Sequence, residues 1–283
     1  MINCMFLEIK FVGGLGNQLF QYATARRLCL KKKIPFLLLG TESYTNDSLG
    51  RKFVLSSLSI IGSKIKIDFF KKIFKPKTKL NKIFTLLRLH KYIYEQGFVL
   101  QTILEKKSLL LSLSGYWQSE HYFDDIRNIL LKEFVPLDLP DYPNWINKKN
   151  LVAIHIRRQD YINEKRYGVL TSTYYEKGIL LMKSLLETPE FIFFSDDIEW
   201  CKENFTDNKF IYCEDSNWEY DYLQLHLISK CKHQIVANSS FSWWGAWLNE
   251  NPNKIVIRPT TPFIDQNLLY QSHYPANWLK IEN

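Results

Sequence analysis

The chain of 283 residues lacks the marks of several protein classes. No apolar run reaches the roughly eighteen residues that a transmembrane helix needs. No basic region followed by an apolar one indicates a secretory signal peptide. The five cysteines are scattered, and none is spaced Cys-x-x-Cys. This pattern argues against a disulfide framework and against a zinc site, and it predicts a cytoplasmic protein.

Net basic charge is missing outside one segment, because the rest of the chain sums to 8 − 9 = −1. Ten Lys and Arg lie between residues 64 and 92 against a single Asp, while the whole chain carries a formal charge of +8. Apolar residues interleave with these lysines. The segment could be a helix face packed on its own domain, or a patch that binds anionic lipid at the inner face of the cytoplasmic membrane. We expect no nucleic-acid partner, because no zinc-finger or RNP-like motif accompanies the charge.

The length of the chain and its apolar share of 46% allow two ordinary domains. A strand over Phe6–Val12, a glycine loop and a helix over Leu19–Leu30 predict the start of a Rossmann-like unit. The loop is not a dinucleotide fingerprint, because Leu19 stands where that motif needs Gly or Ala. Further elements of this domain are expected at 34–39 and 109–114 (strands) and at 124–134 (a helix capped by Asp124 or Asp125).

Strands also alternate with helices in the second half, which predicts a parallel, doubly wound sheet. We expect Ser195 or Asp196 to cap one helix and Asp221 to cap another. A proline-rich linker at 136–149 separates two domains, which we place at 1–140 and 150–283. The predicted strands begin at 151 and lie at 190–194, 209–212, 234–237 and 255–258, and the predicted helices lie at 172–186, 198–204 and 222–231.

The most informative stretch runs from Leu151 to Tyr161. It begins as a buried strand and ends in His155, Arg157 and Arg158, which no core accepts unpaired. Strand alternation would place His155 and Arg157 on one face and Arg158 on the other. Two guanidiniums at the carboxyl end of a strand predict a pyrophosphate clamp. A structural Arg–Asp ion pair at the strand end is the alternative.

Polar clusters follow two further strands, so we expect three clusters at one edge of the sheet. Asp196 and Asp197 suit the paired donors of guanine, although capping a helix is their simpler role. Asn238, Ser239 and Ser240 open a helix, where N–H groups and hydroxyls suit a diphosphate. No metal is expected, because adjacent aspartates diverge and the arginines can supply the positive charge.

Five motifs together resemble the bacterial α-1,2-fucosyltransferases, glycosyltransferase family eleven. They run in order from about residue 8 to residue 258, and the last one is long and rich in tryptophan. The motifs are Gly13-Gly-Leu-Gly-Asn-Gln-Leu-Phe-Gln-Tyr-Ala23, Gly115-Tyr-Trp-Gln-Ser119, His155-Ile-Arg-Arg-Gln-Asp-Tyr161, Phe194-Ser-Asp-Asp197 and Asn238-Ser-Ser-Phe-Ser-Trp-Trp-Gly-Ala-Trp-Leu248.

The resemblance implies an α/β fold of the GT-B type, with two Rossmann-like domains facing a cleft. It implies inverting transfer of L-fucose from GDP-β-L-fucose to the 2-hydroxyl of a galactose-type sugar, without a cofactor or metal. The acceptor would be a galactose-containing glycan or a lipid-linked oligosaccharide. Arg157 would be the principal clamp on the diphosphate. The other donor-side residues would be His155, Arg158, Asp196, Asp197, Asn238, Ser239, Ser240, Gly14 and Gly16.

On the acceptor side we expect Gln18, Trp117 and Gln118, with Asn17 facing the reaction centre. Helix capping is the alternative role for Asn17 and Gln18. Asp160 is the first candidate for the base that takes the acceptor proton, and Glu164 is the second. A late proton transfer needs no base, so this alternative stays open.

Overall fold

The computed structural model describes residues 4–47, 49–62, 90–95, 108–162, 168–261 and 274–283. The chain forms two compact units, Met1–Phe134 and Val135–Asn283. The proline-rich segment that we predicted as a linker belongs to the second unit in this division. Each unit carries its own parallel sheet.

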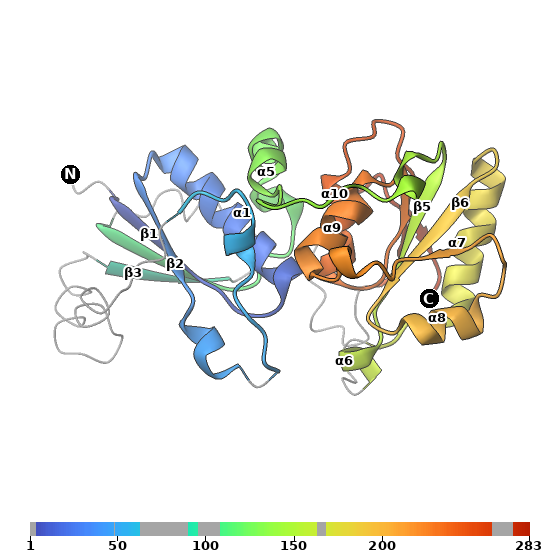
Figure 1. The fold of residues 1–283 in the computed structure, drawn as a ribbon. Helices are drawn as coiled ribbons and strands as arrows, with labels where there is room; N and C mark the ends of the chain where they lie inside the picture. Colours follow the sequence, from blue (N-terminus) through green and yellow to red (C-terminus); the bar gives the residue numbers. More distant parts are fainter. Residues whose placement is uncertain (1–3, 48, 63–89, 96–107, 163–167, 262–273) are drawn as a thin grey trace. The chain divides into compact units, whose positions relative to one another are not determined.

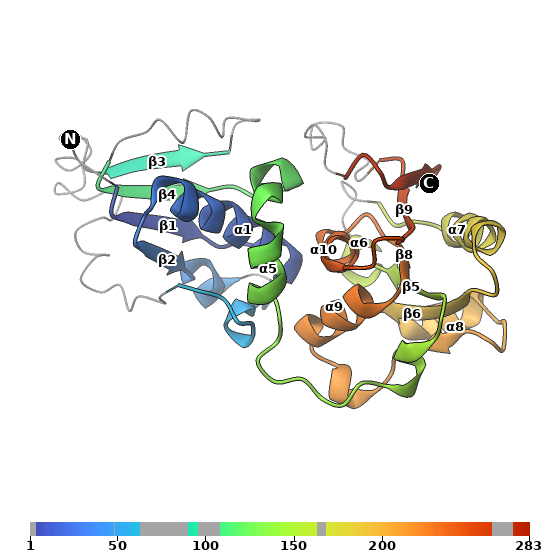
Figure 2. The same ribbon diagram turned by 90° about the horizontal axis from the view of Figure 1, so that it is seen from above.

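The first unit is built on four parallel strands in the order β2-β1-β4-β3. Helix α1 (Leu15–Lys32) lies against this sheet, as Figure 2 shows. The strands are β1 (Phe6–Lys10), β2 (Phe36–Gly40), β3 (His90–Tyr94) and β4 (Leu110–Ser114). Strand β3 was not predicted. It contains the last three residues of the basic segment 64–92, whose residues 64–89 lie outside the described part of the chain.

Helix α5 (Arg127–Glu133) is joined to α1 through the buried carboxylate of Glu133. Glu133 accepts hydrogen bonds from the Tyr22 hydroxyl at 2.7 Å and from Arg26 Nε at 2.8 Å, both on α1. The helix has no side-chain cap. The capping predicted for Asp124 or Asp125 is therefore wrong, and Asp125 instead pairs with Arg27.

Helix α1 begins four residues earlier than the sequence predicted, at Leu15. Gly14 is the N-cap residue, with extended backbone. Gly13 has a φ of 84°, and a Cβ atom there would lie 2.4 Å from Nδ2 of Asn17. The two glycines thus let the chain turn sharply into the helix. Consequently Gly16, Asn17 and Gln18 lie in the first turn of α1 and not in a loop.

The second unit has six parallel strands in the order β10-β9-β8-β5-β6-β7. Helices α7 (Ser172–Leu185) and α8 (Ile198–Asn204) pack on one face, and α9 (Asp221–Lys230) and α10 (Ser240–Leu248) lie on the other, as Figure 1 shows. This is the predicted doubly wound arrangement. The strands are β5 (Leu151–Ile156), β6 (Glu190–Ser195), β7 (Ile211–Tyr212), β8 (His233–Ile235), β9 (Val256–Pro259) and β10 (Leu279–Ile281), the last of which was not predicted.

Two predicted helix caps are wrong. Helix α8 is capped by Asp197, whose side chain accepts from the backbone N–H of Trp200, and Ser195 accepts from the N–H of Asp197. Helix α9 already includes Asp221, and Tyr220 is its N-cap. Polar residues adjacent in sequence compete for the same cap, so the sequence alone places a helix start only to within one or two residues.

All five cysteines are free thiols. In the part of the chain that the structure describes, no helix is both long enough and apolar enough to span a bilayer.

Candidate active site

Strand β5 ends at Ile156, so Arg157 and Arg158 lie in the turn that follows and not in the strand. Strand alternation therefore does not decide where they point. The turn leads into the short helix α6 (Gln159–Ile162). Asp196, directly after β6, holds this turn: its carboxylate accepts from the backbone N–H groups of Arg158 at 2.9 Å and Gln159 at 3.2 Å.

Arg157 is flanked by two carboxylates. Its Nε donates to Oδ1 of Asp160 at 2.8 Å, and its Nη1 lies 3.2 Å from Oδ2 of Asp196. Burial works against the charge of this guanidinium, but the two aspartates outweigh burial and raise the pKa of Arg157. Nη2 has no hydrogen-bond partner among the described residues, so one edge of the guanidinium remains open.

Arg158 is held in the same way by the next aspartate. Its Nε donates to Oδ2 of Asp197 at 3.0 Å, and its guanidinium carbon lies 4.0 Å from the ring centroid of Trp200. Neither of its terminal nitrogens has a partner in the described part of the chain. The predicted alternative, an Arg–Asp ion pair at the strand end, is thus present for both arginines. It orients them and leaves terminal N–H groups for a ligand.

This pairing changes how the two aspartates must be interpreted. Asp196 accepts two backbone N–H groups and Asp197 caps α8, so each carboxylate already has protein partners. Burial raises the pKa of Asp196, although Arg157 acts in the opposite direction. The predicted contact of Asp196 or Asp197 with guanine stays a prediction, and it would require sharing or exchange of these bonds.

His155 lies at the carboxyl end of β5 and is buried. Its ring is 4.9 Å from the ring centroid of Phe241 on α10, and its Nδ1 is buried without a hydrogen-bond partner. Burial, with Arg157 adding to the effect, lowers the pKa of His155 to about 3. The imidazole is therefore neutral at neutral pH, and its unpartnered nitrogen suits an uncharged hydrogen bond to a ligand.

The loop between β8 and α10 brings the third predicted cluster to the same edge of the sheet. Asn238 donates from Nδ2 to the carbonyl of Gly168 at 2.9 Å, which ties the loop to the chain before α7. Ser239 caps α10 and is buried. The Ser240 hydroxyl has no partner among the described residues. The first turn of α10 thus offers a hydroxyl beside its N–H groups, as an anion site requires.

In the first unit, Asn17 and Gln118 meet at the carboxyl edge of the sheet. Nε2 of Gln118 donates to Oδ1 of Asn17 at 2.7 Å. In the described part of the chain, Nδ2 of Asn17 and Oε1 of Gln118 have no partner. The pair therefore presents one donor and one acceptor, which suits a sugar hydroxyl.

Two predicted acceptor residues lie elsewhere than expected. Gln18 is fully buried, and its amide contacts the carbonyls of Gly13 and Lys52 and the N–H of Val54. Trp117 is 1% exposed and packs edge-on against Tyr122. Neither can contact a sugar in this conformation. Both belong to the interior of the first unit.

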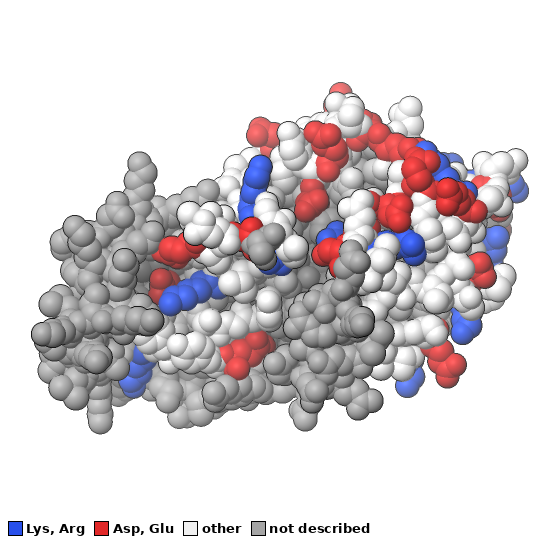
Figure 3. Space-filling view, turned by 90° about the horizontal axis from the view of Figure 1, so that it is seen from below, with Lys and Arg blue, Asp and Glu red and all other residues white. Residues whose placement is uncertain are grey.

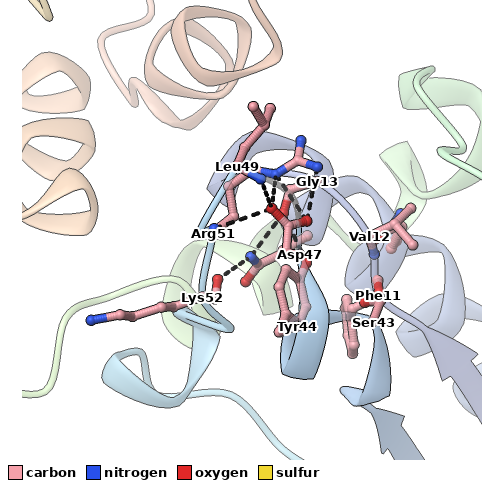
Figure 4. A network of polar contacts seen from close by, with 11 residues as sticks. Phe11, Val12, Gly13, Ser43, Tyr44, Asp47, Leu49, Arg51 and Lys52 are labelled. Carbon is pink, nitrogen blue, oxygen red and sulfur yellow. Dashed lines mark hydrogen bonds and ion pairs between the residues drawn. The ribbon is translucent and has the colours of Figure 1, made fainter. Parts of the chain in front are cut away.

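Side chains of the segment after β2 hold the glycine loop, as Figure 4 shows. The Tyr44 hydroxyl donates to the carbonyl of Gly13 at 2.8 Å, and Ser43 donates to the carbonyl of Phe11. Asp47 accepts from Arg51 Nε and Nη2, at 3.0 and 2.9 Å, and from two backbone N–H groups. The hydrogen bond from Arg51, above all, lowers the pKa of Asp47 to about 2.

Two charged residues at the sheet edges were not predicted from the sequence. Glu95, just after β3, accepts from the N–H groups of Tyr116 and Trp117 at 2.7 and 2.9 Å. Arg258 lies in β9, next to β8, and the loop after β8 carries Asn238. A signal existed for Arg258, because it follows a buried run as Arg157 does. None existed for Glu95, since β3 was not predicted.

Known proteins are similar to this chain in sequence and in fold. The sequence profile described as glycosyl transferase family 11 matches residues 6–282. The chain belongs to this family. It is a glycosyltransferase, as the five motifs predicted.

This family 11 transferase is similar along its length to two Escherichia coli proteins. It is 35% identical over 292 residues to an alpha-1,2-colitosyltransferase, covering 96% of this chain and 98% of the other. It is 34% identical to the O-antigen biosynthesis glycosyltransferase WbnK, covering 90% and 94%. It is 24% identical to the galactoside alpha-(1,2)-fucosyltransferase 1 of Alouatta belzebul, covering 83% of this chain and 63% of the other.

The fold of the family 11 transferase is shared with a solved structure. An Arabidopsis thaliana FUT1 variant in complex with GDP superposes with a TM-score of 0.50 at 12% identity, covering 96% of this chain and 75% of the other. At this identity the likeness concerns the fold. The predicted α/β fold of the GT-B type is confirmed.

No cluster of three His, Cys, Asp or Glu that could hold a metal occurs among the described residues. Asp160, the first candidate base, lies in the first turn of α6 and is held by Arg157 through Oδ1. Its Oδ2 has no partner in the described residues. Glu164, the second candidate, lies outside the described part of the chain.

Proposed function

We propose that this family 11 protein is an inverting α-1,2-fucosyltransferase. It would move L-fucose from GDP-β-L-fucose to the 2-hydroxyl of a galactose-type sugar during surface-glycan synthesis. The observation that carries the proposal is the cluster at the carboxyl ends of β5, β6 and β8. There two oriented arginines lie beside a neutral histidine and the first turn of a helix. Membership in family 11 supports the same interpretation.

Arg157 and Arg158 would bind the diphosphate and stabilise it as it leaves. Breaking the fucose–phosphate bond builds positive charge on the sugar ring and negative charge on GDP. Fixed donors bind the more anionic leaving group more tightly than the intact donor, so they lower the barrier. The aspartate pairs fix both guanidiniums before the ligand arrives, which reduces the ordering that binding requires.

The smaller donors would complete the donor site. The neutral ring of His155 would hydrogen-bond the donor through the nitrogen that is buried without a partner. Ser240 and the N–H groups that open α10 would contact a phosphate oxygen, with Ser239 and Asn238 shaping the loop. No metal is part of this proposal, because the arginines supply the charge that a divalent cation would bring.

The acceptor hydroxyl must lose its proton as the new bond forms. We assign Asp160 as the first candidate for this step, since its Oδ2 is unpartnered among the described residues. Asn17 and Gln118 would hold the acceptor sugar through their open donor and acceptor. The alternative without a base keeps the same donor site, because an oxocarbenium ion makes the attacking hydroxyl acidic.

The donor sugar is the least constrained part of the proposal. The name of one relative specifies colitose, which is L-fucose without its 3-hydroxyl. A transferase of the same fold with another donor or linkage is therefore the second candidate. A protein that binds the sugar nucleotide without turnover is the third, and it is disfavoured because both arginines and the Asn17–Gln118 pair are in place.

The test is GDP release from GDP-fucose and GDP-colitose in the presence of EDTA, with galactose, lactose, N-acetyllactosamine and the type-one disaccharide as acceptors. We expect acceptor-dependent release, and a loss of about 100-fold or more in kcat for Arg157→Ala. Arg27→Ala, which removes a paired arginine of the first unit, is the matched control and should keep full activity.

The outcomes separate the candidates. Release with GDP-colitose alone would show that colitose, and not fucose, is the sugar transferred. A product linked through another hydroxyl would show that the linkage is not α-1,2. Binding of GDP without release from either donor, with any acceptor, would support the non-catalytic candidate. Full activity of Arg157→Ala would show that transfer does not depend on binding of the diphosphate by Arg157.

A further inference from the structure

Arg258 is a third arginine at the carboxyl edge of the second sheet, at the level of His155. Ile154, Ile235 and Ile257 are register partners across β5, β8 and β9. His155 and Arg258 follow the outer two members of this row. Since neighbouring strands lie about 4.8 Å apart, the two residues are separated by roughly 10 Å across the sheet. An arginine side chain can cover most of that distance.

The side chain of Arg258 is fixed in place. Its Nη1 donates to the carbonyls of Pro259 at 3.0 Å and Thr260 at 3.1 Å. Its guanidinium carbon lies 5.0 Å from the ring centroid of Tyr274. These contacts hold the planar group without neutralising it, because carbonyls and an aromatic face carry no net charge.

No carboxylate accompanies Arg258 among the described residues. Its Nε is buried without a hydrogen-bond partner, and its Nη2 has none in the same part of the chain. Five arginines do pair with a carboxylate in the described part of the chain: Arg26, Arg27, Arg51, Arg157 and Arg158. A half-buried guanidinium without a counter-ion is costly, and an anionic ligand would relieve that cost.

The second unit has a net negative charge, so a cation at the site matters more for binding an anion. Residues 135–283 contain 15 Lys and Arg against 19 Asp and Glu. Figure 3 shows acidic side chains gathered over this unit on the face seen there. The overall field therefore opposes an anion such as a nucleoside diphosphate, and attraction must come from cations at the site itself. Arg157 and Arg158 are each paired with aspartates, whereas Arg258 contacts no carboxylate in the described part of the chain.

We propose that Arg258 is a third phosphate-binding arginine of the donor site. The diphosphate would lie over the end of β8, between Arg157 on the β5 side and Arg258 on the β9 side. The first turn of α10 would contact it from the middle. This inference rests on the proposed function, because it takes the donor to be a nucleoside diphosphate sugar.

The experiment compares GDP, GMP and guanosine binding to the full-length protein by calorimetry. Variants are Arg258→Gln and Arg258→Lys, with Arg157→Ala as the reference for the site and Arg27→Gln as the matched control. We expect Arg258→Gln to weaken GDP binding by about tenfold or more while guanosine binding is unchanged. Arg258→Lys should recover part of the loss, and Arg27→Gln should bind as the wild type does.

A structural role would give a different pattern. If Arg258 only supported the backbone at Pro259 and Thr260, Arg258→Gln would weaken guanosine and GDP equally, and the inference would be overturned. GDP binding that needs Arg157 but is unchanged in Arg258→Gln would overturn this inference alone. A wild-type protein that binds no GDP would overturn the proposed function and this inference together.

Discussion

At the scale of single residues, the glycine loop between β1 and α1 depends on the buried side chain of Gln18. Gln18 is fully buried and joins the loop to the segment after β2 through three hydrogen bonds. The carbonyl of Gly13 keeps a second donor in Tyr44, whereas the carbonyl of Lys52 and the N–H of Val54 have no other partner among the described residues. The position of Asn17, one residue earlier, depends on this anchor.

We therefore expect Gln18→Leu to lower the free energy of unfolding by about 2 kcal/mol, because two partly buried backbone groups lose their partners. Chemical denaturation measures the change. Gln224→Leu is the matched control, since the Gln224 side chain makes no hydrogen bond among the described residues, and it should change stability by less than about 0.5 kcal/mol. Equal effects of the two substitutions would contradict the assigned role.

At the scale of elements, the proposed donor site depends on how closely α9 and α10 pack. A Cβ atom at Gly245 in α10 would lie 2.5 Å from Cγ2 of Ile228 in α9. The absence of a side chain at Gly245 lets the two helices approach. That approach positions the first turn of α10, which carries Ser239 and Ser240.

Alanine in place of a helical glycine normally stabilises a helix. At Gly245 we expect the opposite: Gly245→Ala should lower the free energy of unfolding by about 2 kcal/mol, because the β-branched Ile228 cannot move aside. A double-mutant cycle with Ile228→Ala tests the cause. The two substitutions should couple favourably, since the second removes the clashing methyl group. Additive effects would show that another contact is responsible.

At the scale of the whole molecule, buried neutral histidines make stability depend on pH. Burial, with a neighbouring cation adding to it, lowers the pKa of His155 to about 3 and those of His90 and His226 to about 4. An unfolded histidine titrates near 6.5. Between these values the unfolded chain takes up protons that the native protein does not, so acidification favours unfolding.

We expect the free energy of unfolding to fall between pH 7.5 and pH 5.5, by roughly 1 kcal/mol for each of these histidines. Denaturation curves across this range measure the slope. His226→Gln should reduce it, because the substitution removes one titrating group while glutamine can still reach the Tyr142 hydroxyl that contacts Nε2 of His226. An unchanged slope in this variant would contradict the prediction.

Local patterns in the sequence were sufficient to predict the fold class, the position of most strands and helices, and the edge of the sheet where the polar clusters after β5, β6 and β8 lie. Apolar runs and helical periodicity depend on nearby residues, and parallel strands necessarily bring their carboxyl ends to one edge. The motif at His155–Tyr161 is therefore interpretable from the sequence alone.

Which polar groups are already satisfied depends on the tertiary structure. Asp196 and Asp197 pair with Arg157 and Arg158 from a different strand end, Gln18 and Trp117 are buried, and Arg258 has no described carboxylate partner. Pairing and burial depend on residues far apart in the chain, which local patterns do not contain. The physical reason is that the charge a ligand meets is the charge left after the protein's own contacts are made.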